Sequence, residues 1–219
     1  MIKTIHAAVL EELKQDLVLK EIEPSPLLFG QVLVKVMFSG VCRSQVMEVR
    51  GGRGVDNWLP HLLGHEGSGI VQEVGEGVTK VKIGDEVILG WVKGEGAEAP
   101  GAKYKCGDQI INSGRVTTFS NYSIVSENRL VKKPKSLALD AAVLFGCALP
   151  TGAGIVLNQI KPKKNSSIAF IGLGGIGLSG LMATKAFECK NIIAVDVSDE
   201  KLKLAKEFGA THIINASTS

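Results

Sequence analysis

The sequence predicts an α/β protein, in which a β-rich domain is followed by a partial doubly wound domain of alternating strands and helices. Over residues 1–135 the chain has short apolar strands separated by turns. Helical spacing then takes over, and beyond Lys164 the order becomes strand, helix, strand, helix, strand. The domain boundary is expected near Pro150, which gives domains at 1–149 and 150–219.

Composition narrows the class of protein. With 219 residues and 45% hydrophobic content, the chain can bury a sizeable core. The 25 basic and 22 acidic residues are scattered, without a basic block or interleaved aromatic residues, so nucleic acid is not an expected partner. No stretch approaches the roughly 20 apolar residues of a membrane span, and the N-terminus has no signal-like apolar run. A soluble, cytoplasmic protein is expected.

The first domain is justified by several strand-like segments. QVLVKVMFSG alternates and is expected to place four apolar side chains inward, namely Val32, Val34, Val36 and Phe38. Further short strands are expected in GSGIVQEVG, DEVILGW and FSNYSIVSENRLVKKP. Between Trp91 and Arg115 the chain is polar and rich in glycine, which indicates a long surface excursion.

The second domain contains a βαβ unit. Ile168 to Ile171 forms an apolar strand, a glycine turn and a helix follow, and Ile192 to Val195 forms the next strand. Gly172, Gly174 and Gly177 fit G-x-G-x-x-G, in which the glycines permit a tight turn, approach of a pyrophosphate and close packing of the helix on the strand.

This context favours dinucleotide binding. Asp196 ends the second strand, 19 residues after Gly177, where a carboxylate would accept bonds from ribose hydroxyls and repel a 2′-phosphate, so NAD is expected rather than NADP. The free N–H groups of the helix start, at Gly174, Gly175 and Ile176, favour an anion. The alternative is a βαβ crossover in which the glycines only allow tight packing and no nucleotide binds.

Metal-binding residues form the other candidate site. The four cysteines are too few and too widely spaced for a disulfide scaffold, so they are packing residues or metal ligands. His65, in GHEGSG, and the thiols of Cys42 and Cys147 are ligand types that zinc prefers, and three ligands leave one position open. Spacing alone does not decide this: the cysteines could pack in the core, His65 could be a satisfied core histidine, and Glu66 a surface charge.

Four segments together resemble a known family. GHEGSGIVQEVGEGV, residues 64–78, matches G-H-E-x-x-G-x(5)-G-x-x-V, the zinc signature of the zinc-containing medium-chain alcohol dehydrogenases. GVCRS (40–44), FGCALPTGAG (145–154) and GLGGIG (172–177) resemble the segments of its other two zinc ligands and its coenzyme fingerprint, in the family's order. The resemblance covers the whole chain. It implies a GroES-like catalytic domain, followed by the N-terminal part of an NAD-binding Rossmann domain.

The resemblance also implies a reaction and its residues. Catalytic zinc would be held by Cys42, His65 and Cys147, with Glu66 beside it as a nearby or transient ligand. Zinc would ease loss of the alcohol's proton, which Ser44 would pass outward, while hydride moves to NAD to give an aldehyde or ketone. The expected partner is a small-molecule alcohol or carbonyl compound.

Further coenzyme contacts follow from the resemblance alone. Arg43 matches a position that meets the pyrophosphate, and Lys201 one that contacts the adenosine ribose, although both could be solvated charges. Thr151 and Gly152 would lie where the coenzyme bridges the domains.

Three departures from the family pattern carry expectations. Gln45 stands where the family usually has an aspartate bonded to the ligand histidine, so weaker zinc binding is expected. Met47 replaces a histidine that ends the proton relay in some members. Of the four cysteines of the family's structural zinc lobe only Cys106 is present, so one catalytic zinc and no structural zinc are expected.

The chain ends after the third strand of the second domain, in THIINASTS. Only the half-sheet of order 3-2-1 is therefore expected, with strand 1 as an exposed apolar edge, and a fragment or a chain completed by a partner is the expectation. Two other functions stay open, a zinc-free quinone or enoyl reductase and a non-catalytic metal- or nucleotide-binding fragment. The oligomeric state and the particular alcohol are not predicted.

Overall fold

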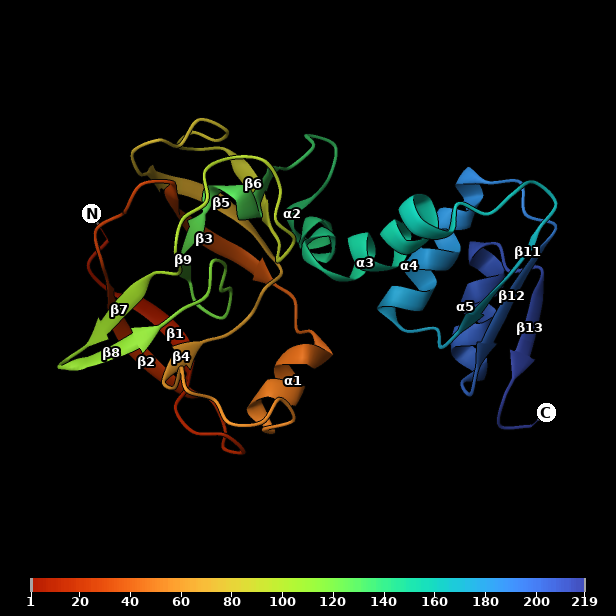
Figure 1. The fold of residues 1–219 in the computed structure, drawn as a ribbon, viewed down its shortest axis with the longest axis horizontal. Coiled ribbons are helices and arrows are strands. Elements are labelled where there is room, and N and C mark those ends of the chain that lie inside the picture. The colour runs from red at the N-terminus through yellow and green to blue at the C-terminus, as the bar shows by residue number, and fades with distance from the viewer. Residues whose placement is uncertain (1, 219) are drawn as a thin grey trace. The chain divides into compact units, whose positions relative to one another are not determined.

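The computed structural model describes residues 2–218 and divides into two compact units, Met1–Cys147 and Ala148–Ser219. The first unit is β-rich, and the second alternates strands and helices (Figure 1). The predicted α/β fold class is therefore confirmed.

The first unit contains two sheets. A closed barrel has the order β1-β2-β7-β8-β4, and a five-stranded sheet has the order β10-β6-β5-β3-β9 (Figure 1). The strands are β1 (Ile5–Leu10), β2 (Val18–Pro24), β3 (Gln31–Ser39), β4 (His61–Leu62), β5 (Gly67–Val74), β6 (Glu86–Leu89), β7 (Lys103–Cys106), β8 (Gln109–Asn112), β9 (Tyr122–Ser126) and β10 (Leu130–Lys132). The helical elements are α1 (Arg43–Val49), η1 (Glu127–Arg129), α2 (Leu139–Ala142) and η2 (Val143–Gly146).

Strand β3 lies between the two apolar cores of this unit. Val32 and Val34 are fully buried in one core, and Leu33, on the opposite side, is buried in the other. Phe38 is 44% exposed, so the prediction that it points inward is wrong. The pairing of β3 with β5 shifts register between Val36 and Phe38, and such an irregularity breaks the simple alternation of faces.

The segment from Trp91 to Arg115 is not only a surface excursion, and that prediction is corrected. Its second half forms the hairpin β7–β8, which belongs to the barrel. Tyr104 and Ile111 are fully buried there, and the Tyr104 hydroxyl accepts the Ile124 N–H at 2.9 Å. Burial raises the pKa of Tyr104 to about 12. Short strands that alternate charged and apolar residues, as in KYKC, were hidden by the surrounding glycines.

A buried carboxylate organises the first half of that segment. Glu127 is fully buried and accepts N–H groups from Thr79 at 2.6 Å and from Lys80 and Ala97, each at 2.5 Å. Burial by itself would raise the pKa of Glu127, but these backbone donors more than offset it and hold the pKa below its usual value. We call this arrangement the Glu127 anchor.

The second unit begins with α3 (Ala148–Gly154) and η3 (Ile155–Ile160) and continues with the predicted alternation. Its elements are β11 (Ser167–Ile171), α4 (Gly175–Ala183), η4 (Thr184–Ala186), β12 (Asn191–Asp196), α5 (Asp199–Phe208) and β13 (His212–Asn215). The three strands are parallel in the order β11-β12-β13, as the sequence predicts.

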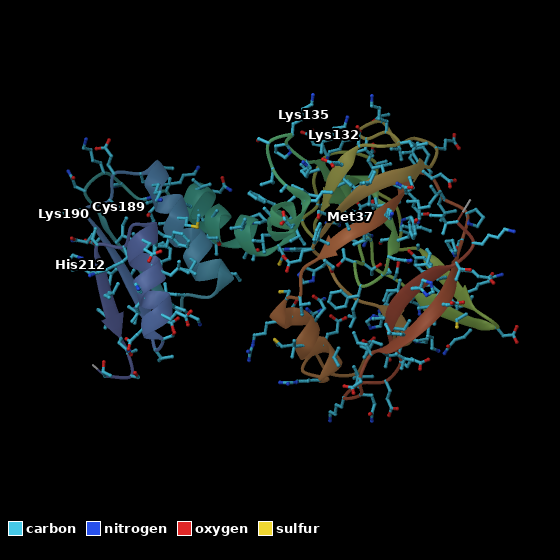
Figure 2. The ribbon with its side chains drawn as sticks, turned by 180° about the vertical axis from the view of Figure 1, so that it is seen from behind. Met37, Lys132, Lys135, Cys189, Lys190 and His212 are labelled. Atoms are coloured by element: carbon cyan, nitrogen blue, oxygen red, sulfur yellow. The ribbon has the colours of Figure 1, made fainter. Side chains whose placement is uncertain are left out.

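One end of this sheet is remote from the glycine turn. Cys189 lies just before β12 and His212 opens β13, so both lie at the amino ends of the parallel strands (Figure 2).

Between residues 2 and 218, no single helix is long and apolar enough to cross a membrane, although the broken pair Leu139–Gly146 and Ala148–Ile160 meets the same test together.

Candidate metal centre and nucleotide turn

The first unit brings Cys42, His65 and Cys147 together. One ligand atom from each lies within 4.8 Å of the others, and His65 Nε2 is 3.2 Å from Cys147 Sγ. Cys147 is buried, and the other two are partly buried. Two thiols and an imidazole at such distances can enclose a tetrahedral ion with one position open, which is the arrangement of catalytic zinc sites.

Local backbone geometry positions the three side chains. Cys42 is the N-cap residue of α1 and makes no capping bond, so its sulfur is available to a ligand. His65 follows Gly64, whose φ of +88° suits glycine and whose added Cβ would lie 2.3 Å from Thr118 Oγ1. Cys147 follows η2 directly. The chain therefore needs a tight glycine turn to bring His65 to the two sulfur atoms.

The surroundings of His65 favour its neutral form. Burial lowers the pKa of the imidazole, and the nearby Arg53 guanidinium lowers the pKa further. Because only a neutral imidazole nitrogen can bind a metal, both effects favour ligation.

Glu66 is held beside this centre by two glycines. Its side chain is 5% exposed. A Cβ added at Gly40 would lie 2.6 Å from the Glu66 carboxyl carbon, and one at Gly146 would lie 2.7 Å from Glu66 Cβ. The carboxylate thus occupies space that glycine leaves open, between the segments that carry Cys42 and Cys147.

Two buried oxygen atoms of α1 indicate a missing partner. Within the described residues, Ser44 Oγ and Gln45 Oε1 are buried without a hydrogen-bond partner. Buried polar atoms are nearly always paired, so such atoms need an explanation such as an ion, water or substrate. Both follow Cys42 in the first turn of α1, and their positions fit a metal centre that also receives a hydroxyl compound. Met47, in contrast, is 48% exposed.

The glycine turn of the second unit has the geometry expected for a nucleotide. Gly172 has φ of +89°, and Gly174 is the N-cap residue of α4, so the helix begins at Gly175 and Ile176. A Cβ added at Gly177 would lie only 1.9 Å from the Gly172 carbonyl oxygen. The third glycine is therefore required for close packing of the helix on the turn, and the N–H groups of the helix start stay available to an anion.

Asp196 lies beside this turn. Its carboxylate accepts the Leu173 N–H at 2.7 Å and the Ser198 N–H at 3.0 Å, and these bonds hold the pKa of Asp196 below its usual value. Lys201 Nζ is 4.0 Å from the carboxylate. The structure therefore places Asp196 and Lys201 together at the carboxyl end of β12.

The remaining predicted coenzyme residues are less closely grouped. Arg43 is the exposed first residue of α1 in the first unit. Thr151 lies on α3, and Gly152 is buried against α4, where an added Cβ would lie 2.0 Å from the Ile176 carbonyl oxygen. Gly152 therefore has a packing role within the second unit.

Comparison with known proteins relates both units to one family. Residues 29–135 match the alcohol dehydrogenase GroES-like domain, and residues 175–219 match the zinc-binding dehydrogenase domain. The chain is 34% identical over 241 aligned residues to an alcohol dehydrogenase class-3 of Dictyostelium discoideum, covering 98% of this chain and 63% of that protein. The chain belongs to the zinc-containing medium-chain alcohol dehydrogenase family.

Solved structures of alcohol dehydrogenases agree with this assignment. An alcohol dehydrogenase zinc-binding domain protein of Burkholderia ambifaria has a TM-score of 0.89 at 28% identity, covering 99% of this chain and 65% of that one. Benzyl alcohol dehydrogenase of Acinetobacter calcoaceticus has a TM-score of 0.85 at 31% identity, covering 100% of this chain and 65% of that one. The chain thus spans somewhat less than two thirds of the length of these dehydrogenases.

Sequence reasoning missed a second cluster of ligand-type side chains. Glu48, Asp56 and His61 bring one potential ligand atom each within 4.8 Å of one another. The sequence signal for this cluster is weak. His61 stands close before His65, in HLLGHE, but Glu48 and Asp56 look like ordinary surface charges.

Proposed function

We propose that this chain carries the catalytic metal site and the coenzyme-binding turn of a zinc-dependent alcohol dehydrogenase. The reaction is hydride transfer between a small-molecule alcohol and NAD, with an aldehyde or ketone as the other product. The observation that carries this proposal is the convergence of Cys42, His65 and Cys147.

Zinc fits this ligand set. Two thiolates and a neutral imidazole balance the charge of the ion, and burial of Cys147 limits exchange with solvent. When bound, zinc supplies a Lewis acid that makes an alcohol more acidic and polarises a carbonyl group. Cys42, His65 and Cys147 hold the ion, and Glu66 is the nearby or transient ligand.

Ser44 is the group that receives the alcohol's proton. Its buried Oγ has no partner among the described residues, so it can accept and pass on a proton from a bound hydroxyl compound. Gln45 stands where the family usually has an aspartate, and its buried amide oxygen, which has no hydrogen-bond partner among the described residues, adds no charge to the metal site.

The second unit provides the adenosine and pyrophosphate contacts of NAD. The N–H groups at Gly174, Gly175 and Ile176 bind the pyrophosphate, and Asp196 accepts the ribose hydroxyls. The ionised state of Asp196, favoured by its backbone donors, repels a 2′-phosphate and so favours NAD over NADP. Lys201 contacts the ribose, and Arg43 and Thr151 complete the coenzyme contacts.

The proposal includes the catalytic zinc and does not include the structural zinc of the family. The segment that would hold it carries one cysteine, Cys106, whose side chain packs on the barrel core. Two contacts hold the same segment and support this proposal: the Glu127 anchor and the bond from the Ala99 N–H to Ser126 Oγ, at 2.9 Å.

The test is the zinc content of the purified chain, measured by plasma emission spectrometry. Cys147→Ala should remove one zinc per chain, whereas the matched control Cys189→Ala, in the second unit, should remove none. Equal zinc content in the two variants would contradict the proposal.

A second assay addresses the reaction. Alcohol-dependent formation of NADH should accompany zinc and disappear with it in Cys147→Ala. Zinc without NADH formation would favour the non-catalytic alternative, and reductase activity that is independent of zinc would favour a zinc-free quinone reductase.

A further inference from the structure

A second group of ligand-type side chains lies in the first unit, apart from the cysteine centre. Glu48 is on α1, His61 is on β4, and Asp56 lies in the loop between these elements (Figure 1). His61 Nε2 is 2.9 Å from Asp56 Oδ2 and 3.9 Å from Glu48 Oε1. The side chain of His61 is 9% exposed, that of Asp56 15% and that of Glu48 19%. Two carboxylates and an imidazole therefore meet in a place that is largely shielded from water.

The orientation of His61 is that of a metal ligand. Its Nδ1 is 3.0 Å from the Leu62 carbonyl oxygen, which can only accept, so Nδ1 carries the hydrogen. Nε2 then faces both carboxylates. Metal-binding histidines characteristically donate their other ring N–H to a backbone carbonyl or carboxylate, which fixes the tautomer and the ring.

Each carboxylate presents one oxygen to this point and uses the other elsewhere. Asp56 Oδ1 accepts the Trp58 N–H at 2.9 Å, which leaves Oδ2 toward His61. Glu48 Oε2 pairs with Arg53 Nη1 at 3.2 Å, which leaves Oε1 toward His61. The outer bonds hold both inner oxygens in place, so the three potential ligands are oriented before any ion arrives.

The cluster also has access and room. A hollow of 240 Å³ adjoins it, lined by Leu13, Glu48 and residues 53–58. A divalent ion with three protein ligands needs water to complete its coordination, and the hollow can hold that water.

We propose that Glu48, Asp56 and His61 form a second divalent-cation site, suited to an ion that accepts both carboxylate and imidazole ligands, such as Mn²⁺. Two carboxylates and one neutral imidazole give a charge of −2, which matches the ion, and Arg53 offsets part of it from the outer side. The ion links α1, which begins after Cys42, to β4, which precedes His65. It stabilises the segment that carries two residues of the zinc centre and takes no part in hydride transfer.

The test is a titration of the full chain with Mn²⁺, in which electron paramagnetic resonance measures the free ion. The titration is done on the Cys147→Ala chain, so that the thiol-containing centre is incomplete, and repeated on the unsubstituted chain. One Mn²⁺ should bind per chain in both, and Mn²⁺ should raise the Tm.

Ligand variants locate the bound ion. Glu48→Gln and Asp56→Asn should each weaken binding at least about tenfold, because loss of a ligand costs no less than loss of a supporting contact. Glu12→Gln, which removes an exposed carboxylate from the same unit, should leave binding unchanged. Arg53→Gln removes the positive charge beside Glu48 but keeps an amide that can donate to Glu48 Oε2, so it should tighten binding.

The proposal is overturned if the unsubstituted chain binds no Mn²⁺, or if Glu48→Gln and Asp56→Asn bind it as well as Glu12→Gln does. The Tm of each variant without metal shows whether it is folded. The zinc content lost on Cys147→Ala depends on a different ligand set, so the two proposals fail separately.

Discussion

His65 Nε2 lies 3.2 Å from Cys147 Sγ, although 82 residues separate the two in sequence. Removing the imidazole should therefore break a shared metal site. We expect His65→Gln to have a lower zinc content and a zinc affinity that is at least about tenfold weaker. The control is His6→Gln, at an exposed position, which should keep the zinc content of the unsubstituted chain. Zinc analysis after dialysis measures both, and a His65→Gln chain with undiminished zinc would rule out His65 as a ligand.

Gln45 offers a test in the opposite direction. Its buried Oε1 has no hydrogen-bond partner among the described residues, in the first turn after Cys42. The family usually has an aspartate here that bonds to the ligand histidine, so Gln45→Asp should strengthen zinc binding by about 10 to 100-fold. Competition with a zinc chelator measures the change. Gln72→Asp, at an exposed position, is the control, and an equal response of the two variants would contradict the role of Gln45.

The metal centre shows what sequence could and could not predict. The signature around His65 led to the three proposed ligands through family resemblance, because the signature has a fixed spacing of its glycines and its histidine. The distance from Cys42 to Cys147 along the chain carried no such information, and only folding brings the two together. The cluster of Glu48, Asp56 and His61 had no signature at all, since its geometry depends on a loop of irregular structure.

The same contrast holds for the fold. The βαβ pattern of the second unit was predictable because local periodicity and the glycines at 172, 174 and 177 agree. The β7–β8 hairpin was missed because two four-residue strands give too little periodicity. Phe38 was misplaced because a register shift in β3 depends on its partner β5 rather than on its own sequence.

Glu127 supports the segment near residue 97. Its carboxylate accepts three backbone N–H groups in a fully buried position. Glu127→Gln keeps the shape but turns one acceptor oxygen into a donor, so we expect a loss of about 2 to 4 kcal/mol in the free energy of unfolding. Urea titration measures this, and exposed Glu23→Gln is the control. Equal stability of the two variants would show that the anchor is dispensable.

The stability of the protein should also depend on pH through Glu127. Its pKa in the folded chain lies below the ordinary value, so its contribution is complete above the unfolded pKa of about 4.3 and is lost as the pH falls through the folded pKa. The difference in Tm between the unsubstituted chain and Glu127→Gln should therefore shrink as the pH falls from about 4.3 through the lowered pKa of the folded chain. A difference that stays constant as the pH falls would show that the charge of Glu127 does not contribute.

Gly177 separates the packing of the nucleotide turn from its chemistry. An added Cβ would lie 1.9 Å from the Gly172 carbonyl oxygen, and that atom belongs to the backbone and cannot move aside without opening the turn. We expect Gly177→Ala to destabilise the second unit by about 1 to 3 kcal/mol and to weaken NADH binding at least about tenfold, measured by nicotinamide fluorescence. Gly154→Ala, in a helix of the same unit where the nearest atom is 3.7 Å away, is the control and should keep both properties. Because Gly177 offers no side chain to the coenzyme, a loss confined to Gly177→Ala has to come from the displaced turn, whereas NADH binding that survives it would place the pyrophosphate away from the start of α4.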